Sequence, residues 1–460
     1  MAVAQVTQNA PADTNPGNYD VFNIAWPLAV KATMLHGIIV IDAYLVSALG
    51  ESSLASLGLA GAIAGLLLGF FFAFSGAAQI RTAQAFGTSN PRLLKSVFLC
   101  GLSINLSIAL VGMCLIWAFA EGVLTTIAPT PQIAADALAY LAAFTVVFLA
   151  EAISQNTGSF FNGCGRTRIP LYSYALSLPV NVSVSYVLIH GMFGLPELGL
   201  IGAAIGSSIA ALLRVVFLGV VLLKSEMHML RAAGWESGSM RAAMRRHLAF
   251  SFPIAVTFLS MSVATQVSML IFAQMDVIAF AALTIILPWV QVTGTMGMSW
   301  AQATGILIAQ LLGSQAHGEM LDRFLATAWR GVFVAAALVS ILLASVSLFA
   351  SHIYAQLQPE TVATLQGFLP VLLVLPVLRC TNAVCGNTLR AAGDTVYVMK
   401  LFVGAQWLFR IPMMAAFVLW FDLPAVWVLF VLLLEELVKL PWFHLRVFTG
   451  RWKTAQVFQE

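Results

Sequence analysis

Long apolar runs alternate with short polar segments along the whole chain. A helix that crosses a bilayer needs about 20 mostly apolar residues, and twelve runs reach that length. The pattern predicts transmembrane helices near residues 22–48, 54–80, 93–118, 132–158, 168–191, 199–223, 248–273, 278–305, 323–348, 361–388, 396–420 and 424–447. Six of them precede a polar stretch at residues 224–247, and six follow it.

The two halves of the chain repeat each other at a nearly constant spacing. Ala25–Ala29 (AWPLA) is matched in the second half by Ser251–Ala255 (SFPIA), and Gly165–Thr167 (GRT) is matched, at almost the same spacing, by Gly393–Thr395 (GDT). An even number of helices per half gives both halves the same orientation in the membrane. We therefore predict an all-α membrane protein of twelve transmembrane helices in two six-helix lobes, related by a pseudo-two-fold axis along the membrane normal.

Composition agrees with this class and argues against an enzyme. Hydrophobic residues make up 60% of the chain and charged residues 9%, with a mean hydropathy of +0.92, which is foreign to soluble domains. The chain has no GxGxxG after a strand, no GxxxxGKS/T, no HExxH pair and no GxSxG turn. The five cysteines predict neither a disulfide framework nor a metal site. Without a nucleotide site, transport would be passive or driven by an ion gradient.

Charged residues alternate in sign between most successive connections. Three connections and the central polar stretch are basic, whereas the six connections on the opposite side carry acids without Lys or Arg. By the positive-inside rule, the basic connections and both termini are cytoplasmic, and the net charge of +3 reflects topology rather than nucleic-acid binding. The expected segments are a disordered cytoplasmic tail at 1–20, an N-lobe at 21–223, a basic cytoplasmic linker at 224–247, a C-lobe at 248–448 and a cytoplasmic tail at 449–460. The linker either anchors the topology alone or also lies on anionic lipid.

Few ionisable residues fall within the predicted spans, and such residues are functional candidates because an uncompensated charge in hydrocarbon is costly. Lys31, Arg214 and Lys439 lie toward the cytoplasmic ends, where long basic side chains usually snorkel to the surface, so we expect them to be anchors. The remaining candidates are Asp42, Glu151, Arg379, Arg410, Glu435 and Glu436.

Asp42 is the strongest candidate for a coupling group. It lies late in the first helix, and its equivalent in the second repeat is Ser268, so only one half carries the acid. Burial disfavours the ionised form of a carboxylate unless cations or donors stabilise it, which suits a group that binds a proton or Na⁺ by turns. The alternative is an acid at a helix end, already in external water.

Glu151 and Arg379 occupy equivalent positions of the two repeats, with opposite charge. One hypothesis is that they form a charge pair, directly or through substrate and water, across a central cavity. The alternative is that each is neutralised separately inside its own bundle.

Several motifs, in order along nearly the whole chain, resemble the multidrug and toxic-compound extrusion (MATE) family of cation-coupled antiporters. Asp42–Gly50 with Leu54–Gly58 resembles the family pattern D-x-x-x-V-x-x-L-G-x-x-x-L-A-x-x-G, and Leu389–Thr395 resembles L-R-G/A-x-G-D-T. Phe193–Gly199 with Gly202–Ala204 resembles the signature between helices 5 and 6. The resemblance implies two six-helix lobes around a cavity for amphipathic, often cationic compounds, which leave the cell as cations enter.

The resemblance also implies residues for ion coupling. Asp42 matches the family's helix 1 aspartate, Asn181 the first polar position of helix 5 and Ser207 a helix 6 hydroxyl, while Ser185 stands where some members carry a second aspartate and Asn156 is a looser match. Met261 and Arg379 occupy positions where some members have second-lobe acids, so we expect coupling to rest on the first lobe, without acidic residues clustered inside the second. One carboxylate among neutral oxygens slightly favours a proton over Na⁺.

Aromatic and Met side chains suit a broad substrate range, because aromatic faces attract organic cations and Met repacks around varied shapes. Candidate cavity residues are Phe70, Phe74, Met269, Met296 and Trp300. Prolines within the predicted helices withdraw backbone donors and can mark hinges; they are Pro27, Pro179 and Pro288.

The sequence thus favours an antiporter of the bacterial inner membrane that exports amphipathic compounds in exchange for H⁺ or Na⁺, without a cofactor. Its partners would be small-molecule substrates and membrane lipids, and we expect a monomer. The alternatives are a flippase for a lipid-linked saccharide in a related transporter superfamily, which calls for a strongly basic cavity, an uncoupled channel, and a membrane enzyme.

Overall fold

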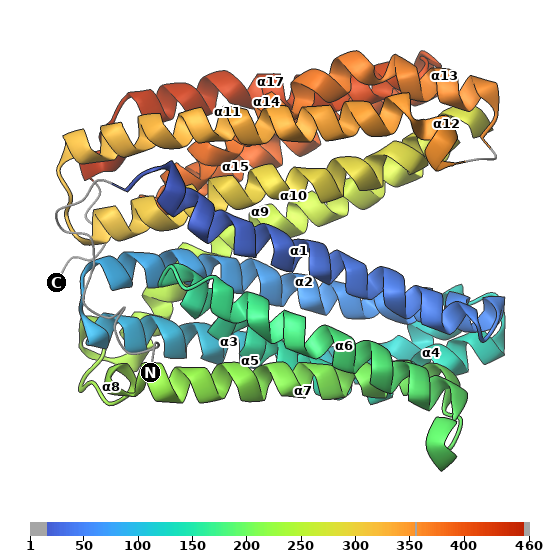
Figure 1. Ribbon diagram of the computed structural model, residues 1–460, viewed down its shortest axis with the longest axis horizontal. Helices are drawn as coiled ribbons and strands as arrows, with labels where there is room; N and C mark the ends of the chain where they lie inside the picture. Colours follow the sequence, from blue (N-terminus) through green and yellow to red (C-terminus); the bar gives the residue numbers. More distant parts are fainter. Residues whose placement is uncertain (1–15, 355–356, 455–460) are drawn as a thin grey trace. The chain divides into compact units, whose positions relative to one another are not determined.

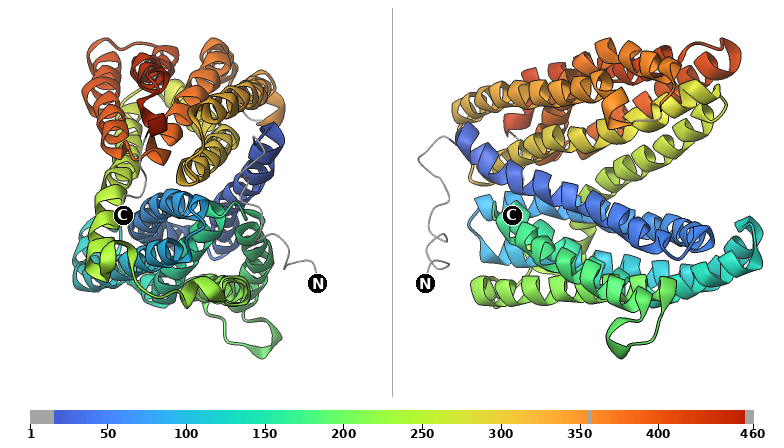
Figure 2. Two further views of the ribbon diagram at one scale, coloured as in Figure 1. Left: turned by 90° about the vertical axis from the view of Figure 1, so that its left-hand side faces the viewer. Right: turned by 45° about the vertical axis from the view of Figure 1, so that its right-hand side comes forward.

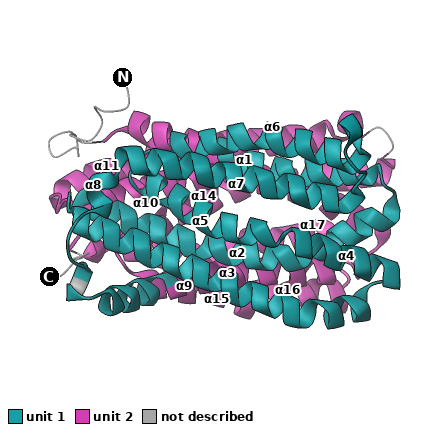
Figure 3. Cartoon of the chain, turned by 90° about the horizontal axis from the view of Figure 1, so that it is seen from below, with its two compact units in different colours: residues 1–8, 30–251 teal, residues 9–29, 252–460 magenta. Residues whose placement is uncertain are grey.

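The computed structural model describes residues 16–354 and 357–454, and these residues form helices without any strand (Figure 1). The described chain divides into two compact units: unit 1 contains residues 30–251, and unit 2 contains residues 16–29, 252–354 and 357–454 (Figure 3). Two helices pass from one unit to the other, namely α1 (Asn18–Ser47) and α9 (Met240–Phe272). The boundary lies just after Pro27 in α1 and directly precedes Pro253 in α9, and these prolines are repeat equivalents.

Each unit contains its own set of long helices. Those of unit 1 are α2 (Glu51–Gly87), α3 (Pro91–Ile127), α4 (Pro131–Ala143), α5 (Thr145–Gly163), α6 (Arg168–His190), α7 (Gly199–Ser225) and the short α8 (Met227–Leu230). Those of unit 2 are α10 (Val277–Gly313), α11 (Gly318–Leu348), α12 (Ala350–Ile353), α13 (Pro359–Gly367), α14 (Leu369–Ala391), α15 (Thr395–Gly404), the π-helix η3 (Ala405–Arg410), α16 (Ile411–Ala415), the π-helix η4 (Ala416–Trp420) and α17 (Ala425–Phe448).

The twelve predicted spans correspond to these elements. Ten helical segments in the described chain are long and apolar enough to cross a membrane, and α4 with α5, bent by 45°, makes an eleventh. The twelfth span is α17, whose apolar run of 24 residues contains Glu435, Glu436 and Lys439. The predicted helix ends fall short, because α2, α3 and α10 each have 37 residues and continue as helix well beyond the apolar band. At 1.5 Å per residue such a helix is about 55 Å long, against a hydrocarbon core of about 30 Å.

Local sequence fixes where several helices begin and end. Asn90 and Thr130 accept hydrogen bonds from the backbone N–H groups of Arg92 (3.0 Å) and Ile133 (3.3 Å), and each is followed by a proline at the first helical position. Helix α6 ends at Gly191 (φ 64°), in the left-handed region that glycine adopts readily. The connection that follows projects away from the helices (Figure 2), and its Phe193 side chain is 88% exposed.

Small residues bring α6 and α7 into close contact in unit 1. A Cβ atom on Gly202 would overlap the backbone of Leu188, and one on Gly206 would overlap the Ser185 side chain. Two glycines four residues apart let helix backbones approach closely, which is a common way of packing helices in membranes. This packing holds α6, which carries Asn181 and Ser185, directly against α7, which carries Ser207.

The predicted tails and linker differ from the structure in their bounds. Residues 1–15 and 455–460 lie outside the described residues, and α1 begins at Asn18, within the predicted amino-terminal tail at 1–20. The last part of the predicted linker, residues 240–247, belongs to α9. The rest of the linker belongs to unit 1 and is joined to the long helices of that unit by two acids: Glu226 pairs with Arg166 (2.7 Å), and Glu236 pairs with Arg81 (2.8 Å).

The buried Arg81–Glu236 pair yields a stability prediction. Both side chains are more than nine-tenths buried, and removing one partner of such a pair leaves a buried charge uncompensated. We expect Glu236→Ala to lower the free energy of unfolding by about 3–5 kcal/mol, measured as a lower thermal midpoint of the purified protein.

The matched control is Glu319→Ala, because Glu319 forms an exposed ion pair with Arg323 across one helical turn. Exposed pairs contribute at most about 1 kcal/mol, so this variant should unfold close to the wild type. Equal thermal midpoints for the two variants would contradict a stabilising role for the buried pair.

Candidate functional site

Asp42 lies on α1 in unit 1, beside the hydrophobic cluster of that unit. Its neighbours Leu45 and Val46 are buried members of the cluster, and Ile41 packs against it. Asp42 is partly exposed as a whole, but its Oδ1 atom is buried and has no hydrogen-bond partner in the described chain. Asp42 is the one acidic residue of that part of the chain with such an atom.

Two of the polar residues expected around Asp42 meet each other. Asn181 Nδ2 on α6 donates a hydrogen bond to Ser207 Oγ on α7 (3.0 Å). The Asn181 Oδ1 atom and the Ser185 hydroxyl are buried without a hydrogen-bond partner in the described residues. Unpaired buried oxygens are rare in folded proteins and call for an explanation. Helices α1 and α6 of unit 1 thus carry three buried side-chain oxygens without a hydrogen-bond partner in the described residues.

Asn156 belongs to a different contact. Its Nδ2 atom donates to the Phe98 carbonyl on α3 (3.2 Å), and a Cβ atom on Gly101 would overlap its side-chain oxygen. Asn156 therefore joins α5 to α3, and no direct hydrogen bond links it to Asp42 or Asn181 in the described structure.

Glu151 has its charge partner within unit 1. Arg214 Nη2 donates to Glu151 Oε1, and Arg214 Nη1 donates to Ser177 Oγ (3.1 Å). Gln155 Nε2 donates to the other Glu151 oxygen (3.1 Å), and the Arg214 guanidinium lies 4.7 Å from the centre of the Tyr174 ring. Arg214 is buried, so the expectation that it snorkels as an anchor is wrong. The carboxylate of Glu151 compensates the buried charge of Arg214.

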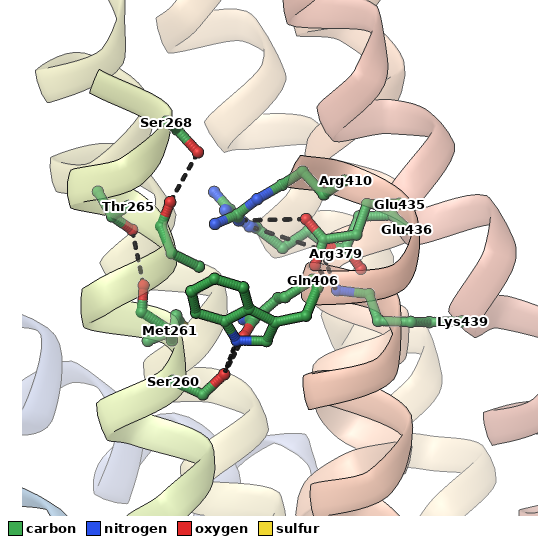
Figure 4. Close-up of polar contacts among 12 residues, drawn as sticks. Ser260, Met261, Thr265, Ser268, Arg379, Gln406, Arg410, Glu435, Glu436 and Lys439 are labelled. Atoms are coloured by element: carbon green, nitrogen blue, oxygen red, sulfur yellow. Dashed lines mark hydrogen bonds and ion pairs between the residues drawn. The ribbon is translucent and has the colours of Figure 1, made fainter. Parts of the chain in front are cut away.

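A larger ionic network lies in unit 2 (Figure 4). Lys439 Nζ donates to Glu435 (3.1 Å) and to Glu436 (2.9 Å), all three on α17. Arg410 Nη1, at the end of η3, donates to Glu435 (3.2 Å), and Arg379 Nε on α14 lies 3.9 Å from Glu436. Arg379, like Glu151, thus has an ion-pair partner in its own unit.

This network corrects two expectations. Lys439 is only 2% exposed and is not a snorkelling anchor, and the interior of the second lobe does contain clustered carboxylates, Glu435 and Glu436. They come from the last helix rather than from the positions of Met261 and Arg379. The spacing E-E-x-x-K was the available signal, because residues three and four apart on a helix face each other.

The residues of α9 that face this network carry no charge. Ser268, the equivalent of Asp42, is buried and donates to the Ala264 carbonyl of its own helix (2.7 Å). Thr265 Oγ1 likewise donates to the Met261 carbonyl (2.9 Å), and the Met261 side chain is 42% exposed (Figure 4).

The candidate cavity residues fall into two groups. Met296 is 48% exposed, and Phe70 and Phe74 are partly exposed, so these side chains have surface for a ligand or lipid. Trp300 is buried between α10 and α11, where its Nε1 donates to the Ala328 carbonyl (3.0 Å), and Met269 packs against the hydrophobic cluster of unit 2. Trp300 therefore serves helix packing in this structure.

The predicted hinge prolines all lie inside helices that continue on both sides. Pro27 is in α1, Pro179 in α6 and Pro288 in α10. A proline within a helix removes one backbone hydrogen bond and weakens the helix there. Their role as hinges stays a prediction.

Comparison with known proteins identifies the family. The model of the MatE family matches residues 27–187 and, a second time, residues 253–415. The chain therefore belongs to the MatE family of multidrug and toxic-compound extrusion transporters. The two matches begin at Pro27 and Pro253, which are equivalent positions of the internal repeat. Members of this family are cation-coupled transporters rather than enzymes, and this chain is accordingly a multi-pass membrane transporter.

Similar proteins cover most of the chain at low identity. The uncharacterized transporter YisQ of Bacillus subtilis is 21% identical over 92% of this chain and 92% of its own length. The probable multidrug resistance protein NorM of Rhizobium meliloti is 26% identical over 83% of this chain and 85% of its own length.

Solved structures share the two-lobe, all-helical fold. The eukaryotic MATE transporter AtDTX14 aligns with a TM-score of 0.78 at 19% identity, covering 95% of this chain and 96% of that one. A MOP superfamily transporter from Pyrococcus furiosus aligns with a TM-score of 0.81 at 15% identity, covering 95% and 97%.

Double-mutant cycles on thermal stability can show whether Glu151 interacts with Arg214 or with Arg379. We expect Glu151→Gln and Arg214→Gln to be non-additive by about 1–3 kcal/mol, because each variant leaves the other partner buried and unpaired. Glu151→Gln and Arg379→Gln should be additive within about 0.5 kcal/mol. Strong coupling between Glu151 and Arg379, or its absence between Glu151 and Arg214, would instead support a bridge between the repeats.

Proposed function

We propose that this protein is a secondary active antiporter that exports amphipathic, often cationic compounds in exchange for H⁺ or Na⁺, with Asp42 as the coupling acid. Membership of the MatE family supports the transport class. The names of relatives such as NorM, a probable multidrug resistance protein, support drugs or toxic compounds as substrates. The single observation that carries the role of Asp42 is its buried, unpartnered carboxylate oxygen.

The contrast with the other buried acids supports this choice. The acids that are at least nine-tenths buried in the described chain each lie beside a cationic side chain; they are Glu151, Glu226, Glu236, Glu435 and Glu436. Their charges are compensated permanently, so a mobile cation would have to compete with a fixed Arg or Lys. Asp42 has no such competitor among the described residues, which suits a group that takes up a proton or Na⁺ and releases it again.

The residue types proposed for the coupling site favour a proton over Na⁺. Asn181, Ser185 and Ser207 would contribute only neutral oxygens, and Asn156 is engaged with α3. A proton needs one acceptor oxygen, whereas Na⁺ requires several oxygen ligands to replace its hydration shell. We therefore favour H⁺ as the coupling ion.

The distribution of charged residues along the chain supports an orientation in the membrane. The basic connections, with Arg231 in the linker and Arg241 and Arg245 at the start of α9, favour cytoplasmic termini in a bacterial inner membrane, with Glu51, Glu197 and Asp422 on the opposite side. Each unit buries its own hydrophobic cluster, so we propose that a monomer in lipid is the working form.

The role of Asp42 is tested by efflux of ethidium from proteoliposomes under an imposed pH gradient. We expect Asp42→Asn to lower gradient-driven efflux at least about a hundredfold, because the amide cannot take up and release the proton. The control is Glu51→Gln, an equivalent change at an exposed acid at the start of α2, which should leave efflux unchanged. Unchanged efflux in Asp42→Asn would remove Asp42 from the mechanism.

The coupling ion is tested in the same vesicles by imposing the two gradients separately. A pH gradient should drive efflux in buffers free of Na⁺, and an inward Na⁺ gradient at equal pH should not. Efflux that requires Na⁺ would reverse the assignment, and efflux without any gradient would indicate a channel.

A further inference from the structure

The ionic network of unit 2 has more positive than negative charge. Its cations are Arg379, Arg410 and Lys439, and its carboxylates are Glu435 and Glu436, which leaves an excess of one positive charge. Arg390 adds to this excess: it is buried, it lies over the same Phe402 ring as Lys439, and it has no ion pair among the described residues. An uncompensated cation inside a membrane bundle is costly and marks a functional site.

The unused hydrogen-bond donors of this network belong to Arg379 and Arg410. Lys439 Nζ donates to both glutamates, and Asn382 Nδ2 donates to Glu436 Oε2 (2.9 Å). Arg410 uses only Nη1, while its Nε and Nη2 atoms are buried without a hydrogen-bond partner in the described chain, on a side chain that is 7% exposed. Arg379 is 35% exposed, and its distance of 3.9 Å to Glu436 is too long for a hydrogen bond.

The backbone beneath Arg410 is also irregular. Arg410 ends the π-helical segment η3, and Pro412 follows shortly after it. Pro412 has no N–H group to bond to the Leu408 carbonyl, so the regular helical ladder is interrupted here. Single π-turns are rare and occur frequently at functional sites.

An aromatic side chain lies on the same π-helical segment as Arg410. Trp407, three residues before Arg410, is 37% exposed and donates to Ser260 Oγ on α9 (2.9 Å), whose hydroxyl donates to Gln406 (2.8 Å). Met261 adds a flexible, 42% exposed side chain on the same helix as Ser260 (Figure 4). Guanidinium donors beside an aromatic face match a molecule with an anionic group on an apolar, aromatic body.

We propose that Arg379 and Arg410 bind the carboxylate of the transported compound, so that the substrates include zwitterions and organic acids with an aromatic body. This inference rests on the proposed transport function and specifies its substrate class. A carboxylate would accept hydrogen bonds from the free Arg donors and offset the excess charge of the network.

The test compares two dyes that differ in one group. Rhodamine 110 carries a free carboxylate, and rhodamine 123 is its methyl ester; both keep the same cationic ring system. Binding of each to the full-length protein, in nanodiscs of uncharged phosphatidylcholine, is measured by fluorescence polarisation. We expect the acid to bind at least about tenfold more tightly than the ester, as charge-assisted hydrogen bonds in a buried site imply.

Two variants assign the preference to the arginines. Arg410→Gln and Arg379→Gln should each reduce the preference for the acid to about twofold or less, and Arg379→Gln, at the more exposed position, remains informative if Arg410→Gln fails to fold. The control Arg323→Gln removes a 74% exposed arginine of the same unit and should keep the wild-type preference.

Three outcomes would overturn the proposal: equal affinity of the wild type for both dyes, an acid preference that survives in both arginine variants, or displacement of the acid dye by octyl phosphate but not by octanoate. The last would point to a phosphate group. Efflux of the ester dye under a pH gradient reports on the proposed antiport separately, so failure of the carboxylate site and failure of the transport function are distinguishable.

Discussion

The cost of a charge inside an apolar helix bundle determines most of what this structure reveals about function. Each deeply buried glutamate in the described chain lies beside Arg or Lys, as Glu151 does with Arg214 and Glu435 with Lys439. Such pairs contribute little net stability, because the attraction mainly offsets desolvation. Because such pairing is general here, the buried charged groups that lack a full set of partners are exceptions. Asp42 in unit 1 has a buried oxygen without a partner, and Arg410 in unit 2 has two buried nitrogens without one.

The two repeats share a scaffold and have diverged in charge. Arg166 pairs with Glu226, whereas its equivalent Asp394 pairs with Arg446 (2.8 Å), so the same position takes part in an ion pair of opposite polarity. Tyr174 and its equivalent Phe402 each lie under cationic side chains, Arg214 in one unit and Lys439 in the other. An aromatic ring attracts a cation without carrying a charge itself, so both repeats have this cation–π contact although the cation differs.

Span number and repeat were predictable from sequence, because apolar run length and spacing are properties of the chain alone. Helix ends were not, since α2 continues as helix through polar residues as far as Gly87. The site was predictable only in part. Asn181 and Ser207 meet as the resemblance implied, but the snorkelling rule misjudged Arg214 and Lys439. That rule considers one helix at a time, whereas Arg214 on α7 is stabilised by Glu151 on α5, a contact that only tertiary packing creates.

The two exceptions in charge pairing bear on how antiport could work. Asp42 belongs to unit 1 and Arg410 to unit 2, so under the two proposals the ion and the anionic substrate group would bind to different residues. One ligand would then not displace the other at a shared atom. Coupling would instead be conformational, with each ligand binding one state of the transporter better than the other. Helices α1 and α9, which pass between the units beside Pro27 and Pro253, are the covalent connections through which a change in one unit reaches the other.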